Sequence, residues 1–278
     1  MALERQTGNF AVAYEKASSE GKPATARDLL KERIKQGIDS DVCYPGAWTT
    51  ESFSCIQGNI YGALAEFNPL IPYAQTAVDA HKNNREFYLT PDILLNGRAA
   101  TEVILEIAEQ DTARPTYKKR VINLGKTKTH NVPTDSFADD NGIVFLARSK
   151  KLAKESGLFL KNKTGIREVT FYLLPIQSKD YARSFWLDCI GHGGRSNFYC
   201  DYWDLYYDLG SLFRVRGKKS AEGAQKISPK EMRALPYTQE QLNSFLETAQ
   251  GIKEGKLGTL QAGKLEELIL GLMQFAKQ

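Results

Sequence analysis

Residues 189–208 contain a group of side chains that could do chemistry. Cys189, His192 and Cys200 could bind a metal ion together with Asp201, or Cys189 could act as a nucleophile with His192 as its base. The spacing C-x2-H-x7-C matches no standard zinc pattern, and residues three apart on a strand point to opposite faces. Only a loop could therefore bring Cys189 and His192 together. A metal-binding protein, or a hydrolase that uses these two residues, is kept as one alternative.

Three aspartates of the same stretch suggest calcium binding as a further chemistry. Asp201, Asp204 and Asp208 are spaced three and four residues apart. Calcium prefers several carboxylates that converge, often from a loop, whereas this spacing places carboxylates along one side of a helix. A calcium-dependent sugar-binding lectin is kept as another alternative.

Residues 181–217, which enclose this stretch, have a composition unlike the rest of the chain. Lys, Glu, Gln and Met together account for 58 of the 278 residues, and none of them lies in this window. Roughly eight would be expected there at the chain's own rate, since these are common residues in globular proteins. The charged residues of the window are four arginines and four aspartates, and ten of its residues are aromatic.

Burial alone explains this composition poorly. Lys, Glu and Gln are scarce in buried strands, but the window also contains aspartates and glycines, which weaken strands. Tyr, Trp, Arg, Ser, Gly and Asn are instead favoured in binding surfaces. Every residue type of the window except tryptophan can be encoded by a codon that ends in a pyrimidine, whereas Lys, Glu, Gln and Met cannot. A segment randomised at the first two codon positions would have this composition, with Trp186 and Trp203 as fixed positions.

The two ends of the window resemble a known family. ARSFWL (182–187) and LFRVRG (212–217) are similar to the strands that open and close the variable region in the variable proteins of diversity-generating retroelements. The resemblance is to the archaeal and uncultivated-bacterial members. VPTDSFADD and IVFLARSKKLAKESGLFL also resemble segments of that group, so the resemblance covers residues from about 85 to 217.

This resemblance implies an α+β protein with a C-type lectin-type fold, in which two helices flank a small antiparallel sheet. It implies a non-enzymatic protein without catalytic residues, cofactor or calcium, which binds a protein or cell-surface ligand through diversified side chains on an exposed sheet face and its loops. The diversified segment is then about 188–208, with ligand-binding positions at Asp188, Ile190, His192, Asn197, Tyr199, Asp201, Tyr202, Asp204, Tyr206, Tyr207 and Asp208. The framework positions are Arg183, Phe185, Trp186, Phe213, Arg214, Val215 and Arg216.

Length and composition limit the other classes of function. The chain has 278 residues, a net charge of +4 and no long run of basic residues, so nothing in it calls for nucleic acid. No secretory signal or membrane span is evident, so a cytoplasmic location is the default expectation and the actual location is left open. The four cysteines lack paired spacing and are expected to be mostly free thiols, with a 189–200 disulfide as an open alternative.

The sequence predicts three regions. Residues 1–80 are expected to be mostly helical, with a helix over 8–37 and an irregular stretch over 38–58. Residues 85–217 are expected to form the lectin-like domain. Its expected strands are 85–90, 120–125, 168–175, 182–189 and 211–217. Its expected helices are 91–110 and 149–161. Residues 143–148 are expected to form either a helix or a strand, and residues 130–142 a loop. Residues 218–278 are expected to be a helical tail that could make an oligomer contact.

Overall fold

The computed structural model of the protein describes residues 2–38, 40–43, 46–188, 190, 197–199, 205–206 and 210–216. Residues 1–220 form one compact unit, and residues 221–278 belong to a second one. The expected helical tail and its oligomer contact lie outside the described residues.

Helices and strands alternate along the described part of the chain. Its helices are α1 (Phe10–Ser19), α2 (Ala26–Gln36), α3 (Ala74–Lys82), α4 (Ala100–Gln110), α5 (Asn141–Ala147) and α6 (Lys150–Thr164), with short 3-10 turns η1 (Ala65–Phe67), η2 (Thr116–Lys118) and η3 (Thr134–Ser136). Its strands are β1 (Ala2–Thr7), β2 (Lys22–Pro23), β3 (Ala47–Ile56), β4 (Asn59–Ala63), β5 (Phe87–Tyr88), β6 (Leu94–Leu95), β7 (Arg98–Ala99), β8 (Val121–Gly125), β9 (His130–Pro133), β10 (Glu168–Tyr172), β11 (Tyr181–Leu187), β12 (Phe198–Tyr199) and β13 (Ser211–Arg216).

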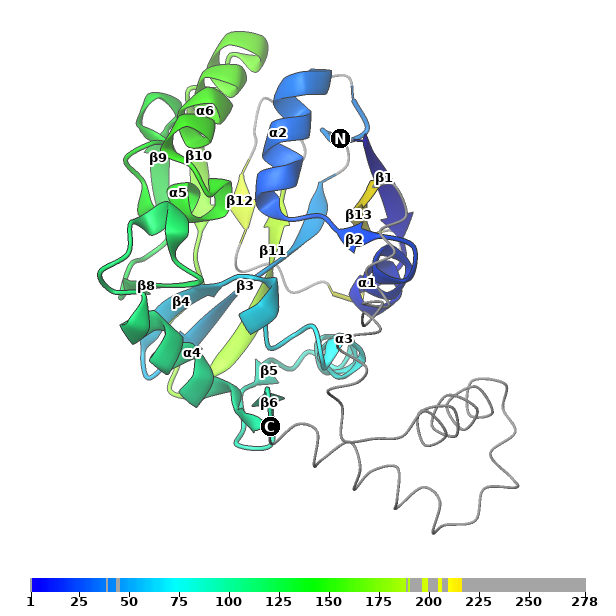
Figure 1. The fold of residues 1–278 in the computed structure, drawn as a ribbon, viewed down its shortest axis with the longest axis vertical. Helices are drawn as coiled ribbons and strands as arrows, with labels where there is room; N and C mark the ends of the chain where they lie inside the picture. The colour runs from blue at the N-terminus through cyan, green and yellow to red at the C-terminus, as the bar shows by residue number, and fades with distance from the viewer. Residues whose placement is uncertain are drawn as a thin grey trace, which may run out of the picture. The chain divides into compact units, whose positions relative to one another are not determined.

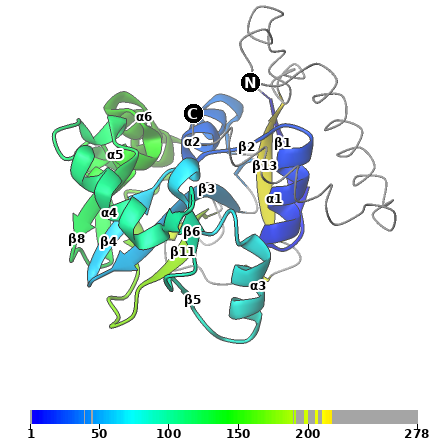
Figure 2. The same cartoon turned by 60° about the horizontal axis from the view of Figure 1, so that its bottom comes forward.

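One mixed sheet organises these elements, and β3 lies at its centre (Figure 1). The strand order is β1-β13-β3-β11-β12-β10-β9, and β4 with β8 extends the sheet from β3. Most pairs are antiparallel, but β12 runs parallel to β10 and β13 runs parallel to β3. Helix α1 lies along β1 and β13, as Figure 2 shows. The described sheet is therefore larger than the small antiparallel sheet that the resemblance implied.

Hydrophobic residues pack on both faces of this sheet. One core joins α2, α5 and α6 to Phe53 of β3 and Phe185 of β11. The other joins α1, α3 and α4 to Trp48 of β3 and Trp186 of β11. Because helices cover both faces, all residues of β3 and β11 are buried. Strand β11 thus has no exposed face, so any exposed residues among the predicted ligand-binding positions are expected beyond its end.

Helix α6 begins and helix α2 ends at residues that suit these positions. The Ser149 side chain accepts a hydrogen bond from the Leu152 backbone N–H at 3.2 Å, and α6 begins there as expected. Helix α2 ends before Gly37, whose φ of 86° suits glycine. The predicted strands over 120–125, 168–175, 182–189 and 211–217 are present as β8, β10, β11 and β13, and 143–148 lies mainly in helix α5.

Four expectations about local structure were wrong. The helix over 8–37 is two helices separated by β2, because Pro23 cannot continue a helix. The stretch 38–58 contains β3, and the loop 130–142 begins with β9. The helix expected over 91–110 starts only at Ala100, because Asn96 and Gly97 have φ values of 53° and 77° and turn the β6–β7 hairpin.

Residues 1–80 differ from the mostly helical region that was expected. They contribute β1, β3 and β4 to the same sheet as the strands of residues 85–217. Strand β1 pairs with β13 along its whole length, from Ala2 opposite Arg216 to Thr7 opposite Ser211. The two regions therefore belong to one compact unit.

Candidate display site

Strand β11 supplies the rigid start of the candidate site. Phe185 is fully buried, and the Trp186 ring meets the Trp48 ring edge-to-face with centroids 5.3 Å apart. Arg183 is buried as well, and its Nε donates to Glu86 Oε2 at 3.0 Å, which pairs the charge. These three framework positions have fixed surroundings, so substitutions there would disturb the core.

Strand β13 supplies the rigid end. Phe213 is buried, Val215 is half-buried against the core, and Arg214 forms an ion pair with Glu4 at 2.8 Å and another with Glu20. The hydrogen bond to Glu4 raises the pKa of Arg214. The remaining framework position, Arg216, pairs with Ala2 through its backbone, and its side chain is outside the described atoms.

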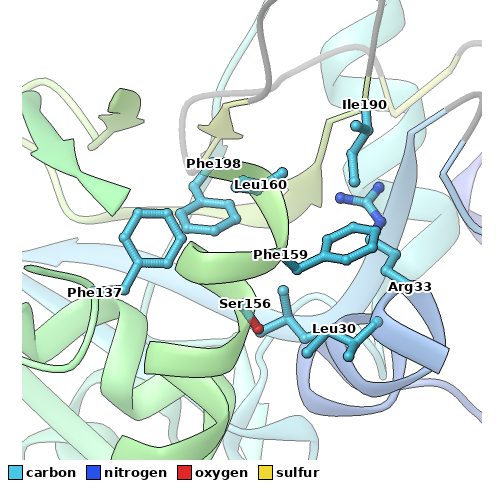
Figure 3. A pocket seen from close by; sticks show the side chains of 9 residues that line it. Leu30, Arg33, Phe137, Ser156, Phe159, Leu160, Ile190 and Phe198 are labelled. Carbon is cyan, nitrogen blue, oxygen red and sulfur yellow. The ribbon is translucent and has the colours of Figure 1, made fainter. Parts of the chain in front are cut away.

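Helix α2 and the residues after it hold the chain where it leaves β11. Arg33 Nη2 donates to the Asp188 carbonyl oxygen at 2.6 Å, and Arg33 Nε donates to the Val42 carbonyl oxygen at 2.9 Å. The Ile190 backbone N–H donates to the Cys43 carbonyl oxygen at 2.8 Å. The Ile190 side chain lines a narrow, mainly apolar cleft between α2 and α6, as Figure 3 shows. Ile190 is thus buried, whereas Asp188 is half-buried.

Strand β12 holds the next part of the segment. The Asp188 backbone N–H donates to the Asn197 carbonyl oxygen at 3.1 Å, and Asn197 Oδ1 accepts from the Thr170 backbone N–H at 3.2 Å. Asn197 Nδ2 donates to the Tyr199 hydroxyl at 3.1 Å. The Tyr199 ring stacks on the Tyr172 ring, with centroids 4.6 Å apart and planes 8° apart. Asn197 is buried, and Tyr199 is half-buried.

The N-terminal part of the chain holds the last part of the segment. The Phe10 backbone N–H donates to the Leu205 carbonyl oxygen at 2.8 Å, and the Gly8 N–H donates to the Gly210 carbonyl oxygen at 3.2 Å. Leu205 is completely buried, while its neighbour Tyr206 is 40% exposed. Leu205 therefore faces the core, and Tyr206 faces the solvent.

The described positions of the predicted site divide by exposure. Tyr206 is exposed, Asp188 and Tyr199 are half-buried, and Ile190 and Asn197 are buried. Ligand contact at the two buried positions would require their side chains to move. The other predicted ligand-binding positions lie outside the described residues: His192, Asp201, Tyr202, Asp204, Tyr207 and Asp208.

Sequence reasoning missed the residues that hold the segment from outside it. The sequence did not single out Arg33, and Cys43 and Phe10 contact the segment through their backbone atoms. The one available signal was that Arg33 lies three and four residues after Leu30 and Leu29, and therefore on the same side of the predicted helix.

The metal and disulfide alternatives are not tested by the described residues. Within those residues, no group of three or more His, Cys, Asp and Glu side chains is placed to hold a metal ion. Cys189, His192 and Cys200 lie outside them, and so does the 189–200 disulfide. Cys43 and Cys55 are buried free thiols, as expected for most of the cysteines. No helix in the described ranges is long and apolar enough to span a membrane.

Comparison with known proteins identifies the fold. No family model matches the chain, and no curated protein matches it. One similar solved structure comes from work on the accommodation of massive sequence variation in Nanoarchaeota by the C-type lectin fold. Its TM-score is 0.54, and its sequence is 10% identical to this chain. The similarity covers 77% of this chain and 97% of the other. The protein therefore has a C-type lectin fold, with mixed helices and strands.

Proposed function

We propose that the protein is a non-enzymatic ligand-binding protein whose binding face is formed by residues 188–208 and is diversified by a retroelement. The C-type lectin fold is typically non-catalytic, which agrees with this class of function. The tyrosine-rich composition of the segment favours another protein, or a cell-surface molecule, as the ligand.

The observation that carries the proposal is the way in which the segment is held. Asp188, Ile190, Leu205 and Gly210 are anchored through their own backbone N–H or carbonyl groups. Backbone hydrogen bonds do not depend on which side chain a residue carries. A segment anchored in this way can change its side chains while its course past the anchors is kept. This is what a diversified binding face requires.

The composition supports the same proposal at the level of the gene. Lys, Glu, Gln and Met are absent from 181–217, while the described framework side chains at both ends of this window are buried, half-buried against the core or ion-paired. A process that alters only the first two codon positions would produce this composition between framework residues that do not change.

The genomic sequence around the gene tests diversification. We expect a nearby near-copy of the segment that encodes residues 181–217, and a reverse transcriptase gene beside it. Differences between the two copies should fall at positions where the near-copy has adenine. A locus without such a copy, or differences spread over all four bases, would contradict diversification.

Two matched libraries test the binding role. The first varies Asp188, Tyr206 and Tyr207 among pyrimidine-ending codons, and the second varies Phe185, Trp186 and Phe213 in the same way. Displayed on yeast and selected on a purified protein such as lysozyme, the first library should keep its display level and yield binders. The second should lose its display level, because its positions are framework. Equal behaviour of the two libraries would contradict the proposal.

Elemental analysis tests the alternative based on the Cys/His/Asp set. The proposal expects no stoichiometric metal in the purified full-length protein. Zinc or iron at one equivalent, lost in a Cys189→Ser and His192→Ala double variant, would favour a metalloprotein. Calcium at one equivalent, lost in an Asp204→Asn variant, would favour a sugar-binding lectin.

A further inference from the structure

A second site lies at a bulge in β3, away from residues 181–217. On β11, Ser184 pairs with Ser52 and Trp186 with Trp48, so three residues of β3 stand opposite the single residue Phe185. Bulges of this kind often redirect side chains next to functional sites. The three residues are Thr49, Thr50 and Glu51, and none of them pairs in register with a residue of β11, β13 or β4.

The bulge coincides with a split in the sheet. On the edge of β3 opposite β11, Trp48 pairs with Leu212 of β13, whereas Ser52 pairs with Ala63 of β4. The neighbour of β3 therefore changes from β13 to β4 across the bulge. A cavity of about 470 Å³ lies at this place, which is a usual size for a small-molecule pocket. Residues of β2, β3, α2 and the chain after β4 line it.

The inner wall of this cavity carries polar atoms without partners. Glu51 is completely buried, and its Oε2 accepts from the Ala26 backbone N–H at 3.0 Å. Glu51 Oε1 and Thr50 Oγ1 have no hydrogen-bond partner among the described residues. Buried polar atoms in native proteins nearly always have a partner, so a water molecule or a ligand in the cavity must supply one for these two atoms.

Positively charged residues also line this cavity. Arg148 lines it, in the left-handed conformation with φ of 55°, which is uncommon for a residue other than glycine. Burial lowers the pKa of Arg148, and the charge of Glu51 opposes that shift. Lys22 and Arg27 are exposed at the rim. Asp28, which also lines the cavity, is already engaged in the capping box of α2.

We propose that this cavity binds a small zwitterion of the amino-acid class, with its ammonium group at Glu51 and Thr50 and its carboxylate toward Arg148 and the basic rim. The ammonium group supplies the donors that Glu51 Oε1 and Thr50 Oγ1 lack. The carboxylate balances the positive charge. Tyr14, Pro23, Leu64 and Ala65 give the cavity apolar surface for a ligand side chain.

Titration of the full-length protein with free amino acids tests this proposal. Each standard amino acid is screened by thermal shift, because a ligand that binds only the folded state raises the melting temperature. Hits are then titrated by calorimetry beside their N-acetyl derivatives, which lack the ammonium group, and their decarboxylated amines, which lack the carboxylate. At least one free amino acid should bind, and each derivative should bind about tenfold more weakly or worse.

Two variants and one control assign the binding to this cavity. Glu51→Gln keeps an acceptor for the Ala26 N–H and should weaken binding by about tenfold or more. Ala65→Trp places a large side chain in the cavity and should abolish binding. Glu109→Gln removes an exposed carboxylate of α4 that does not line the cavity, and should change affinity by less than about threefold.

Three results would overturn the proposal. They are the absence of binding by every amino acid, equal binding of an N-acetyl derivative, and unchanged binding in both Glu51→Gln and Ala65→Trp. Because none of the cavity residues lies in 181–217, each of these results is independent of the proposed display function.

Discussion

Leu205 and Tyr206 are neighbours whose opposite exposure makes a sharp test of the display site. Leu205 is completely buried, and its truncation to alanine should cost about 2–5 kcal/mol of unfolding free energy. Tyr206 is 40% exposed, and its truncation should change that free energy by no more than about 0.5 kcal/mol. The backbone bond from the Phe10 N–H to the Leu205 carbonyl oxygen is available in both variants.

The two substitutions should separate clearly in a melting experiment. For a unit of this size, about 1 kcal/mol shifts the melting temperature by about 2–4 °C. Leu205→Ala should therefore lower it by about 4–20 °C, and Tyr206→Ala by about 2 °C at most. Urea unfolding followed by circular dichroism provides the free energies, and an unchanged m-value shows that the same transition is compared. A loss of several degrees in Tyr206→Ala would refute the assignment of this position to a display surface.

Three further substitutions test the frame and the cavity. Trp186→Ala should cost about 3–5 kcal/mol in urea unfolding, because Trp186 is buried against Trp48; a cost below about 1 kcal/mol would contradict its framework role. Gly210→Ala should cost about 1–3 kcal/mol in the same assay, since an added Cβ would lie 2.0 Å from Trp48 Cη2. A neutral result would mean that the two residues are not in contact. Burial raises the pKa of Glu51 above its usual 4.5. The folded state therefore holds the Glu51 proton more tightly than the unfolded state, and stability falls as pH rises from 4.5 through the raised pKa. Glu51→Gln should lack this loss, so its melting temperature relative to the natural protein should rise over that pH range; a constant difference would contradict burial of the carboxyl.

Composition and local pattern predicted the parts of the fold that depend on few contacts. Ser149 caps α6, and the ends of the 181–217 window form β11 and β13, because cap chemistry and β-branched or aromatic runs act locally. The same window directed attention to a segment in which Leu205 is buried and Tyr206 exposed. Sequence alone could not separate these two, since the exposure of each depends on distant parts of the chain.

The central strand was missed for a physical reason. β3 reads AWTTESFSCI, and its Thr, Ser and Glu residues look like an irregular polar stretch. All ten residues are nevertheless buried, because helices cover both faces and the bulge places Glu51 in a cavity. The alternation that usually marks a half-exposed strand is therefore absent. Strand β1 was missed because its polar residues pair only with β13, more than two hundred residues away in sequence.

The pairing of β1 with β13 has a consequence for how the chain folds as it is synthesised. The first strand of the sheet must wait for the last one, so the sheet closes only after the whole of 188–208 has been synthesised. The hydrogen bonds from the Phe10 N–H to Leu205 and from the Gly8 N–H to Gly210 likewise form only after residues 205 and 210 have been made. Whether the chain folds therefore depends on the sequence of residues 188–208. Under the proposed function, a diversified sequence that cannot fit between β11 and β13 would leave the sheet open and be removed by quality control before it binds a ligand.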